Sequence, residues 1–514
     1  MKKYIVMLGA LCSLTLSSCS WLEVEPISDI TNNGFWKTPD HFESFMVGAH
    51  SRFRSHSYRF SVMGEFRSDI FGEAPFGGEA SQGMERFPNN SLNEENPGIS
   101  NYGDFYNGIN QLNLMIFQVN KSSVLDENSK KSYLAKSYGL RAFYYFQLLR
   151  TWGKVIIAND PTFGEDLDFS NLAKPVSSED EVLSFILADI ENSLTAFDND
   201  YSLQKEKKNS WSKAASLMLK ADVLLWKAKR MNGGSADVNT AKAALEDMMS
   251  HVTLSLQPNF KDVFSYENKN NSEIIFALKS ENNEFSLWGD SYSGILLPQM
   301  SYLKAYYNQD GEIWNTTKDN LFGLMRLQVQ RKHFESTFAE GDTRKDVTLK
   351  GVYRGDGSMV ACIPNKFQGT NIPGSINRAM LDDCPVYRYA DALLLMAEAK
   401  AFLGESPADE INQIRRRAFG NDYFDAHAAE VAFPNQPQDA DVNEAILQER
   451  LCEFFFEGKR WYDLRRFGDE YVFKYTTADK SDPRKLLWPI DKGTLTKNTA
   501  LKQTPGYESA TSGN

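Results

Sequence analysis

The stretch LRAFYYFQLLRTWG, residues 140–153, is the part of the chain that decides the fold class. It completes a helical pattern from residue 131 to residue 152, in which bulky or small apolar residues recur every three or four positions. The recurring residues are Leu134, Tyr138, Ala142, Phe143, Phe146 and Leu149. A similar pattern covers residues 104–119, and the short connection between the two predicts that the helices pack antiparallel. The sequence therefore predicts an α-helical scaffold built from helix pairs.

Further helical patterns extend this scaffold in both directions along the chain. Ser178 is a predicted N-cap with Glu181 three residues later, and the helix that it starts continues to residue 197. The next helix is expected to begin near Ser212, and Gly233-Gly234 ends it before a shorter helix around residues 241–248. Helical patterns return at residues 387–403, 407–419 and 442–467. Pairs of this size, with Ala where helices must approach closely, predict tetratricopeptide-like units.

The chain changes character between residues 256 and 385. Gly, Asn, Asp, Pro and Tyr become frequent there, and helical periodicity weakens. Residues 273–278 are predicted to form a strand and residues 301–307 a helical turn. We therefore expect an N-terminal half over residues 36–255, an inserted loop-rich lobe of mixed structure over 256–385, and a helical C-terminal half over 386–514.

The first residues have the pattern of an export signal. Lys2 and Lys3 precede an apolar stretch that is too short to span a bilayer, and Leu16-Ser-Ser-Cys19 follows as in a bacterial lipobox. This pattern predicts a signal peptide over residues 1–18 and a lipidated Cys19, carrying palmitate among its acyl chains, that starts a tether over residues 19–35. An ordinary secretory signal is the alternative. Glu23 and Glu25 make this tether similar to the acidic surface-export tethers of Bacteroidota lipoproteins. A solvated acidic tether with no export role would have the same composition and is the alternative.

Composition excludes several classes of function. The formal net charge of −12 argues against binding to nucleic acid or to anionic membrane surfaces. With 42% hydrophobic residues the chain can build a large core. The sequence contains no CxxC and no HExxH, and its six His are scattered, so no cofactor is expected. The stretches rich in Asn and Asp lack a spaced loop motif, and the sequence leaves open whether Ca²⁺ binds.

The cysteines after the signal are few. Cys362 and Cys384 flank a loop rich in Gly, Pro and Asn, and they could pair in an oxidising compartment or remain as buried free thiols. Cys452 lies in an apolar helical pattern and is expected to be a buried free thiol.

Four segments in order carry a family resemblance. They are residues 140–153, the stretch YRYADALLLMAEA at 387–399, QERL at 448–451 running into EGKRWYDLRRFG at 457–468, and the closing segment from Leu487-Trp-Pro-Ile490 to Tyr507. Together with the lipobox they resemble the SusD/RagB family of surface nutrient-binding lipoproteins. That resemblance implies tetratricopeptide-like helix pairs and a variable ligand-binding lobe. It also implies a lid role on a SusC-like, TonB-dependent outer-membrane barrel, to which such proteins deliver glycans or, in some branches, peptides.

The matched motifs are expected to be structural rather than ligand-binding. Glu457, Arg460, Asp463 and Arg465 are predicted to form a charged, hydrogen-bonded cluster that locks the C-terminal helix. None of them is predicted to act in catalysis.

Carbohydrate binding needs aromatic faces for the sugar ring and polar groups for its hydroxyls. Trp288 and Tyr292 are the first candidates in the lobe, with Tyr306 and Trp314 close by in sequence. Arg67 and Asp69, before a Gly-rich loop, are the second candidates, and Tyr102 is the third. Core packing is the competing interpretation for each of these aromatic residues.

Two other classes of function remain open at this point. Gly289-Asp290-Ser291 is similar to the motif of GDS-type esterases, but their Asp-x-x-His partner has no counterpart, since the last His is His427. A hydrolase is therefore not expected. A scaffold protein that contacts only the barrel and binds no ligand of its own is the second alternative.

Overall fold

The computed structural model describes residues 35–78, 80–162, 173–203, 207–286, 294–315, 318–319, 321, 323–372 and 378–508. The predicted signal peptide, Cys19, Trp288 and Tyr292 lie outside these residues. Within the described ranges, no helix has both the length and the apolar character that crossing a membrane requires.

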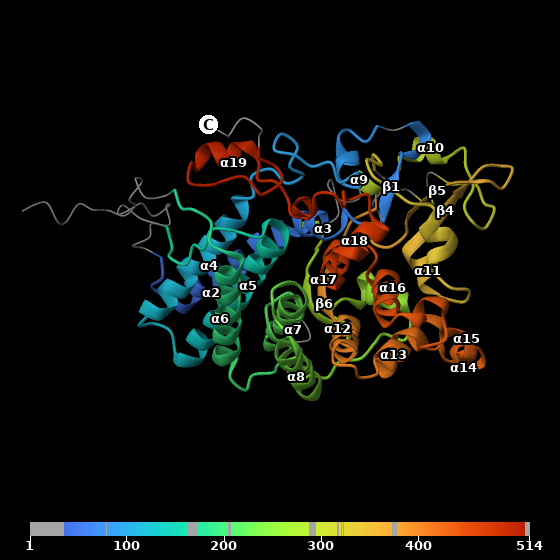
Figure 1. The fold of residues 1–514 in the computed structure, drawn as a ribbon. Coiled ribbons are helices and arrows are strands. Elements are labelled where there is room, and N and C mark those ends of the chain that lie inside the picture. Colours follow the sequence, from blue (N-terminus) through green and yellow to red (C-terminus); the bar gives the residue numbers. More distant parts are fainter. Residues whose placement is uncertain are drawn as a thin grey trace, which may run out of the picture.

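The molecule is mainly helical, which confirms the predicted fold class (Figure 1). The helices of the N-terminal half are α2 (Pro39–Ser55), α3 (Ser57–Glu65), α4 (Asp104–Lys121), α5 (Glu127–Trp152), α6 (Glu179–Phe197), α7 (Lys213–Arg230) and α8 (Ser235–His251). Those of the lobe are α9 (Gly294–Leu296), α10 (Met300–Leu303) and α11 (Arg344–Thr348). The C-terminal helices are α12 (Tyr389–Phe402), α13 (Ala408–Phe419), α14 (Asn421–Ala426), α15 (Ala428–Val431), α16 (Val442–Phe454), α17 (Arg460–Phe467), α18 (Asp469–Tyr475) and α19 (Lys492–Lys497).

Helices that are consecutive in sequence pack against each other, as predicted for the helix pairs. α4 contacts α5, α5 contacts α6, α7 contacts α8 and α12 contacts α13. Close approach requires a small residue at Gly139 of α5, where an added Cβ would lie 1.9 Å from the indole nitrogen of Trp211. The start of α6 is the predicted capping box: the Ser178 hydroxyl accepts from the N–H of Glu181 at 3.3 Å, and the Glu181 carboxylate accepts from the N–H of Ser178 at 2.8 Å.

The prediction of one continuous helix over residues 442–467 is wrong, because the helix is interrupted between α16 and α17. Phe456 and Gly458 adopt left-handed backbone angles there, with φ of 66° and 69°. Glu65 at the end of α3 accepts hydrogen bonds from both N–H groups, at 2.7 and 3.3 Å. Gly64 lies so close to Gly458 that an added Cβ would be 1.7 Å from its carbonyl oxygen. The end of α3 thus occupies the space that a continuous helix would need.

Two small antiparallel sheets connect the lobe to both halves of the chain. The strands are β1 (Phe71–Glu73), β2 (Ile274–Leu278), β3 (Gln328–Val329), β4 (Leu349–Tyr353), β5 (Met359–Pro364) and β6 (Cys384–Arg388). A four-stranded sheet has the order β1-β3-β5-β4, and β2 pairs with β6 in a second sheet. The predicted strand at 273–278 is therefore confirmed. Because β1 comes from the N-terminal half, the lobe shares a sheet with that half.

Most buried apolar side chains belong to one extended core that covers both helical halves. A smaller core joins Phe76 of the N-terminal half to lobe residues Leu303, Trp314, Leu321, Met325, Val352, Ala361 and Ile363. This second core holds the lobe loops in place around α10 and the β4–β5 hairpin.

Candidate functional site

Arg67 joins two distant parts of the chain. The residue is only 1% exposed. Its guanidinium donates to Asn90 Oδ1 at 2.9 Å and to the backbone carbonyls of residues 485–487 at 2.7, 3.2 and 3.1 Å. It also lies 4.4 Å from the ring centroid of Trp461. We assign Arg67 a structural role in place of the predicted ligand contact, because its donors point at the C-terminal segment.

Asp69 is equally engaged inside the fold. Its two carboxylate oxygens accept from Arg460 Nε and Nη2 at 2.9 and 3.0 Å. Burial alone would raise the pKa of Asp69, but the charge and hydrogen bonds of Arg460 bring that pKa below its ordinary value. Its backbone carbonyl accepts from His333 Nε2 at 2.8 Å. Asp69 is thus a partner of the C-terminal motif rather than a group that faces solvent.

The remaining described candidates also pack into the fold. Tyr102 is 2% exposed, with its ring centroid 5.2 Å from that of Trp152. Trp314 is 3% exposed within the lobe core. Tyr306 is half-buried and meets the ring of Phe76 edge-on at 5.0 Å. The structure does not bring Arg67, Tyr102 and Trp314 together on one surface, and we assign them packing roles. Tyr306 keeps a partly exposed side chain in the lobe.

Of the two alternatives for Cys362 and Cys384, the structure has the free thiols and not the bridge. Both are buried free thiols, as is Cys452. Cys362 lies in β5 and is paired with Val329 of β3, whereas Cys384 lies in β6, opposite Leu278 of β2. The two thiols therefore belong to different sheets. Burial raises the pKa of the Cys384 thiol to about 12, so it remains protonated at neutral pH and is no nucleophile.

The charged residues of the C-terminal motif are buried and structural, but they do not form the single hydrogen-bonded cluster that the sequence predicted. Glu457 binds Arg388 and Lys366, and Arg460 binds Asp69. Asp463 pairs with Arg450 of α16 at 2.9 Å and with Arg466 of α17 at 3.0 Å. Arg465 donates to the backbone carbonyl of Arg150. These residues do not bond one another, and each ties α17 or the turn before it to a different part of the molecule.

Arg388 is the centre of the densest ionic cluster. It is fully buried and donates to Glu273, Glu453 and Glu457 at 2.7, 2.6 and 2.9 Å. Arg388 belongs to the resemblance segment 387–399, and the three glutamate side chains are fully buried with it. Partnered buried charges of this kind specify which segments meet rather than provide chemistry.

Two hollows among the described residues have the size of a ligand site: a groove of about 520 Å³, and a second hollow of about 610 Å³ whose lining includes Tyr201, His251 and Asn268. We describe the groove of about 520 Å³, because several aromatic side chains line it. The groove is lined by α2, by the N-terminal part of α5, by the end of α6 and described residues of the connection from α6 to α7, and by β2 and residues that follow it. We call it the α2–α5 groove. Its floor is apolar and includes Phe53, Trp211 and Phe276, and Trp211 meets the ring of Phe276 edge-on at 5.0 Å.

Polar groups along the α2–α5 groove differ in how far they are engaged. His50 accepts from the N–H of Trp211 at 3.1 Å, so its other ring nitrogen donates to the carbonyl of Met46 at 2.9 Å. Burial lowers the pKa of His50 to about 4, and its accepting nitrogen is already used by Trp211, so His50 is uncharged at neutral pH and a very weak base. Arg54 pairs with Glu284 at 2.7 Å. The half-buried Lys136 forms no hydrogen bond or ion pair with another described residue.

This arrangement of polar groups beside apolar side chains can bind a ligand. Lys136, Lys207 and Asn209 offer donors above an aromatic floor. Sequence reasoning missed the groove, because its walls come from segments more than 200 residues apart, such as Arg54 and Glu284, and no local motif links them. Among the described residues, no group of His, Cys, Asp and Glu has the geometry to hold a metal ion.

Comparisons with known proteins identify relatives along the whole chain. Residues 355–507 match the model of the SusD family, and residues 20–220 match a family described as "Starch-binding associating with outer membrane". SusD-like protein P38 of Formosa agariphila is 29% identical over 547 residues, which cover 96% of this chain and 96% of that protein. The solved structure of B. fragilis NanU is 45% identical in sequence to this chain and superposes with a TM-score of 0.89. The match covers 95% of this chain and 100% of the NanU chain. A SusD superfamily protein of Bacteroides vulgatus is 46% identical with a TM-score of 0.86, over 92% of this chain and 100% of that one.

Proposed function

The chain belongs to the SusD family, and on that premise we propose that it captures a glycan or peptide nutrient and delivers it, as a lid, to a SusC-like TonB-dependent transporter. One observation carries this proposal: identity of 45% and 46% with two solved relatives, extending over more than nine-tenths of the chain. The relatives are SusD-like proteins, and the family description of residues 20–220 associates them with the outer membrane.

Surface anchoring through lipid is the first part of the proposal. It rests on Leu16-Ser-Ser-Cys19 and on the acidic residues that follow. Cells expressing the Cys19→Ala variant should show no palmitate label on the protein and should lose it from their surface. Equal labelling of wild type and variant would contradict the anchor.

Ligand capture is the second part, and two regions are proposed for it. Trp288 and Tyr292 remain the first proposal, since they belong to the lobe whose small core holds Trp314 and supports Tyr306. The α2–α5 groove is the second, because it combines a ligand-sized volume with an unpaired Lys136. Trp288→Ala should weaken binding well over tenfold if the lobe holds the ligand, since loss of one aromatic contact removes stacking and apolar burial together.

Binding of the mature protein to a panel of oligosaccharides and peptides, measured by calorimetric titration, tests the capture step. The Lys136→Met variant then tests the groove, and Lys131→Met on the same helix is its matched control. Lys131 is more than half exposed, pairs only with Asp198 at 3.6 Å, and does not line the groove. A ligand in the groove predicts weaker binding for Lys136→Met alone.

Three outcomes separate the proposal from its alternatives. Copurification with a barrel, without binding of any panel member, would favour the scaffold role. Shortened oligosaccharides after incubation would favour a hydrolase. Bound, unaltered ligand together with barrel copurification is the result that we expect.

A further inference from the structure

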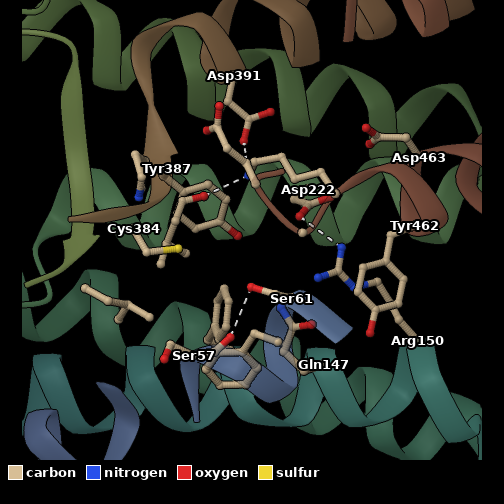
Figure 2. Close-up of a pocket in the computed structure, with 18 of the residues that line it drawn as sticks. Ser57, Ser61, Gln147, Arg150, Asp222, Cys384, Tyr387, Asp391, Tyr462 and Asp463 are labelled. Atoms are coloured by element: carbon tan, nitrogen blue, oxygen red, sulfur yellow. Dashed lines mark hydrogen bonds and ion pairs between the residues drawn. The ribbon is translucent and has the colours of Figure 1, made fainter. Parts of the chain in front are cut away.

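A second, much smaller cavity lies at the junction of the helical halves (Figure 2). Its volume is about 60 Å³. Its lining includes Ser57 and Ser61 of α3, Gln147 and Arg150 of α5, Asp222 of α7, Tyr387 of β6, Asp391 of α12, and Tyr462 and Asp463 of α17. The cavity is thus enclosed by elements from the beginning, the middle and the end of the chain. It is far below the roughly 300 Å³ of the smallest ordinary ligand pockets.

The charges around this cavity are already balanced by ion pairs. Asp222 pairs with Arg466 at 3.1 Å, and Arg450 pairs with Asp391 and with Asp463, both at 2.9 Å. The whole lining holds four cationic and four anionic side chains: Arg150, Arg450, Lys459 and Arg466, and Asp222, Asp391, Glu457 and Asp463. An ion entering the cavity would find no uncompensated charge, so the lining favours a neutral occupant.

Two buried polar side chains face the cavity without a protein partner. Tyr387 is 2% exposed, and its hydroxyl has no hydrogen-bond partner among the described residues. Gln147 is 5% exposed, and no hydrogen bond joins its side-chain amide to another described residue. Figure 2 shows the two side chains on opposite walls of the cavity, with Ser57 and Ser61 beside Gln147. Buried hydroxyl and amide groups almost always have a hydrogen-bond partner in folded proteins.

We propose that the cavity is a hydration site, in which a pair of ordered water molecules bridges the Tyr387 hydroxyl to the Gln147 amide and the serine hydroxyls of α3. A cavity needs about 10–15 Å³ to hold one water molecule, so 60 Å³ has room for at least two. The bridge supplies the missing partners and links β6 to α3 and α5 through hydrogen bonds that side chains alone do not make. Tyr387 lies next to Arg388, so the water bridge continues the buried polar contacts of the segment 387–399 across the junction.

A crystal structure of the full mature chain at a resolution that shows ordered water is the direct test. Density for two waters within hydrogen-bond distance of Tyr387 Oη and the Gln147 amide is expected. A cavity without density would overturn the proposal. Soaking the crystals in rubidium or bromide salts provides a second readout, because an anomalous peak in the cavity would show an ion site instead.

The Tyr387→Phe variant tests the energetic role in solution, with Tyr389→Phe as the matched control. Tyr389 is two residues away, partly exposed, and does not line the cavity. In a hydrated cavity Tyr387→Phe removes a hydrogen bond to water, and the ratio of folded to unfolded protein should fall about 5-fold. In a dry cavity the same change removes an unpaired buried hydroxyl, and that ratio should rise instead. The sign of the change for Tyr387→Phe therefore decides whether the cavity is hydrated or dry. Tyr389→Phe should leave the ratio of folded to unfolded protein nearly unchanged.

Discussion

Replacement of Arg67 by Met removes one of the buried links between the N-terminal half and the last residues of the chain. Met keeps much of the side-chain volume but loses four hydrogen bonds, three of them to the backbone carbonyls of residues 485–487. The carbonyls of Lys485 and Leu487 also accept from the Tyr507 hydroxyl, so the carbonyl of Leu486 is the one that loses its side-chain donor. A buried carbonyl left without a donor costs about 1–3 kcal/mol, and the other lost hydrogen bonds add to this cost. The loss is partly offset because no buried charge has to be desolvated. We expect the free energy of unfolding to fall by about 3 kcal/mol.

Urea titration of wild type and variant, followed by circular dichroism, measures this loss. Arg484→Met is the control, since that side chain is 62% exposed, lies in the same C-terminal segment and pairs only with Asp482. The control should change the free energy of unfolding by less than about 0.5 kcal/mol. A loss below about 1 kcal/mol for Arg67→Met would refute the structural role, and weaker nutrient binding without any loss of stability would return Arg67 to the ligand site.

Three further predictions follow from burial in the fold. Alkylation of the unfolded, unreduced mature protein should modify the thiols of both Cys362 and Cys384, and intact mass that shows neither modified would restore the disulfide. Burial lowers the pKa of His333 to about 4, below its unfolded value of about 6.5, so its stabilising effect is complete above pH 6.5 and is lost as the pH falls towards 4. Urea titrations at pH 7 and pH 4.5 should therefore show a smaller acid-induced loss for His333→Gln than for wild type. Trp314→Ala should cost about 3–5 kcal/mol in stability and leave ligand affinity intact, whereas Trp288→Ala should do the reverse; equal melting temperatures for the two variants would contradict this division.

Several elements of the fold could be predicted from sequence because the information that specifies them is local. The periodicity of residues 131–152 and the Ser178–Glu181 capping box each act within one helix, and the structure confirms both. The strand at 273–278 was also predictable from its composition. The break after α16 was not, because its cause is Glu65, which binds the N–H of Phe456 from 391 residues away.

The candidate site shows the same division. Residue type marked Arg67, Asp69, Tyr102 and Trp314 as suited to a ligand, since charged and aromatic side chains serve both recognition and burial. Only the tertiary structure shows which partner each one has. It likewise assembles the α2–α5 groove, whose walls no sequence motif connects.

The sequence by itself thus determined the helical class, the family motifs and the predicted lipid anchor, because periodicity, capping and export signals are each encoded within a few tens of residues. The tertiary structure decided which polar groups are buried, and it placed Cys362 and Cys384 in strands of two different sheets. It also decided where open space remains, in the α2–α5 groove and in the cavity below Tyr387. The physical reason is that a hydrogen bond or a cavity depends on which distant segments meet, and that meeting is settled only when the whole core packs.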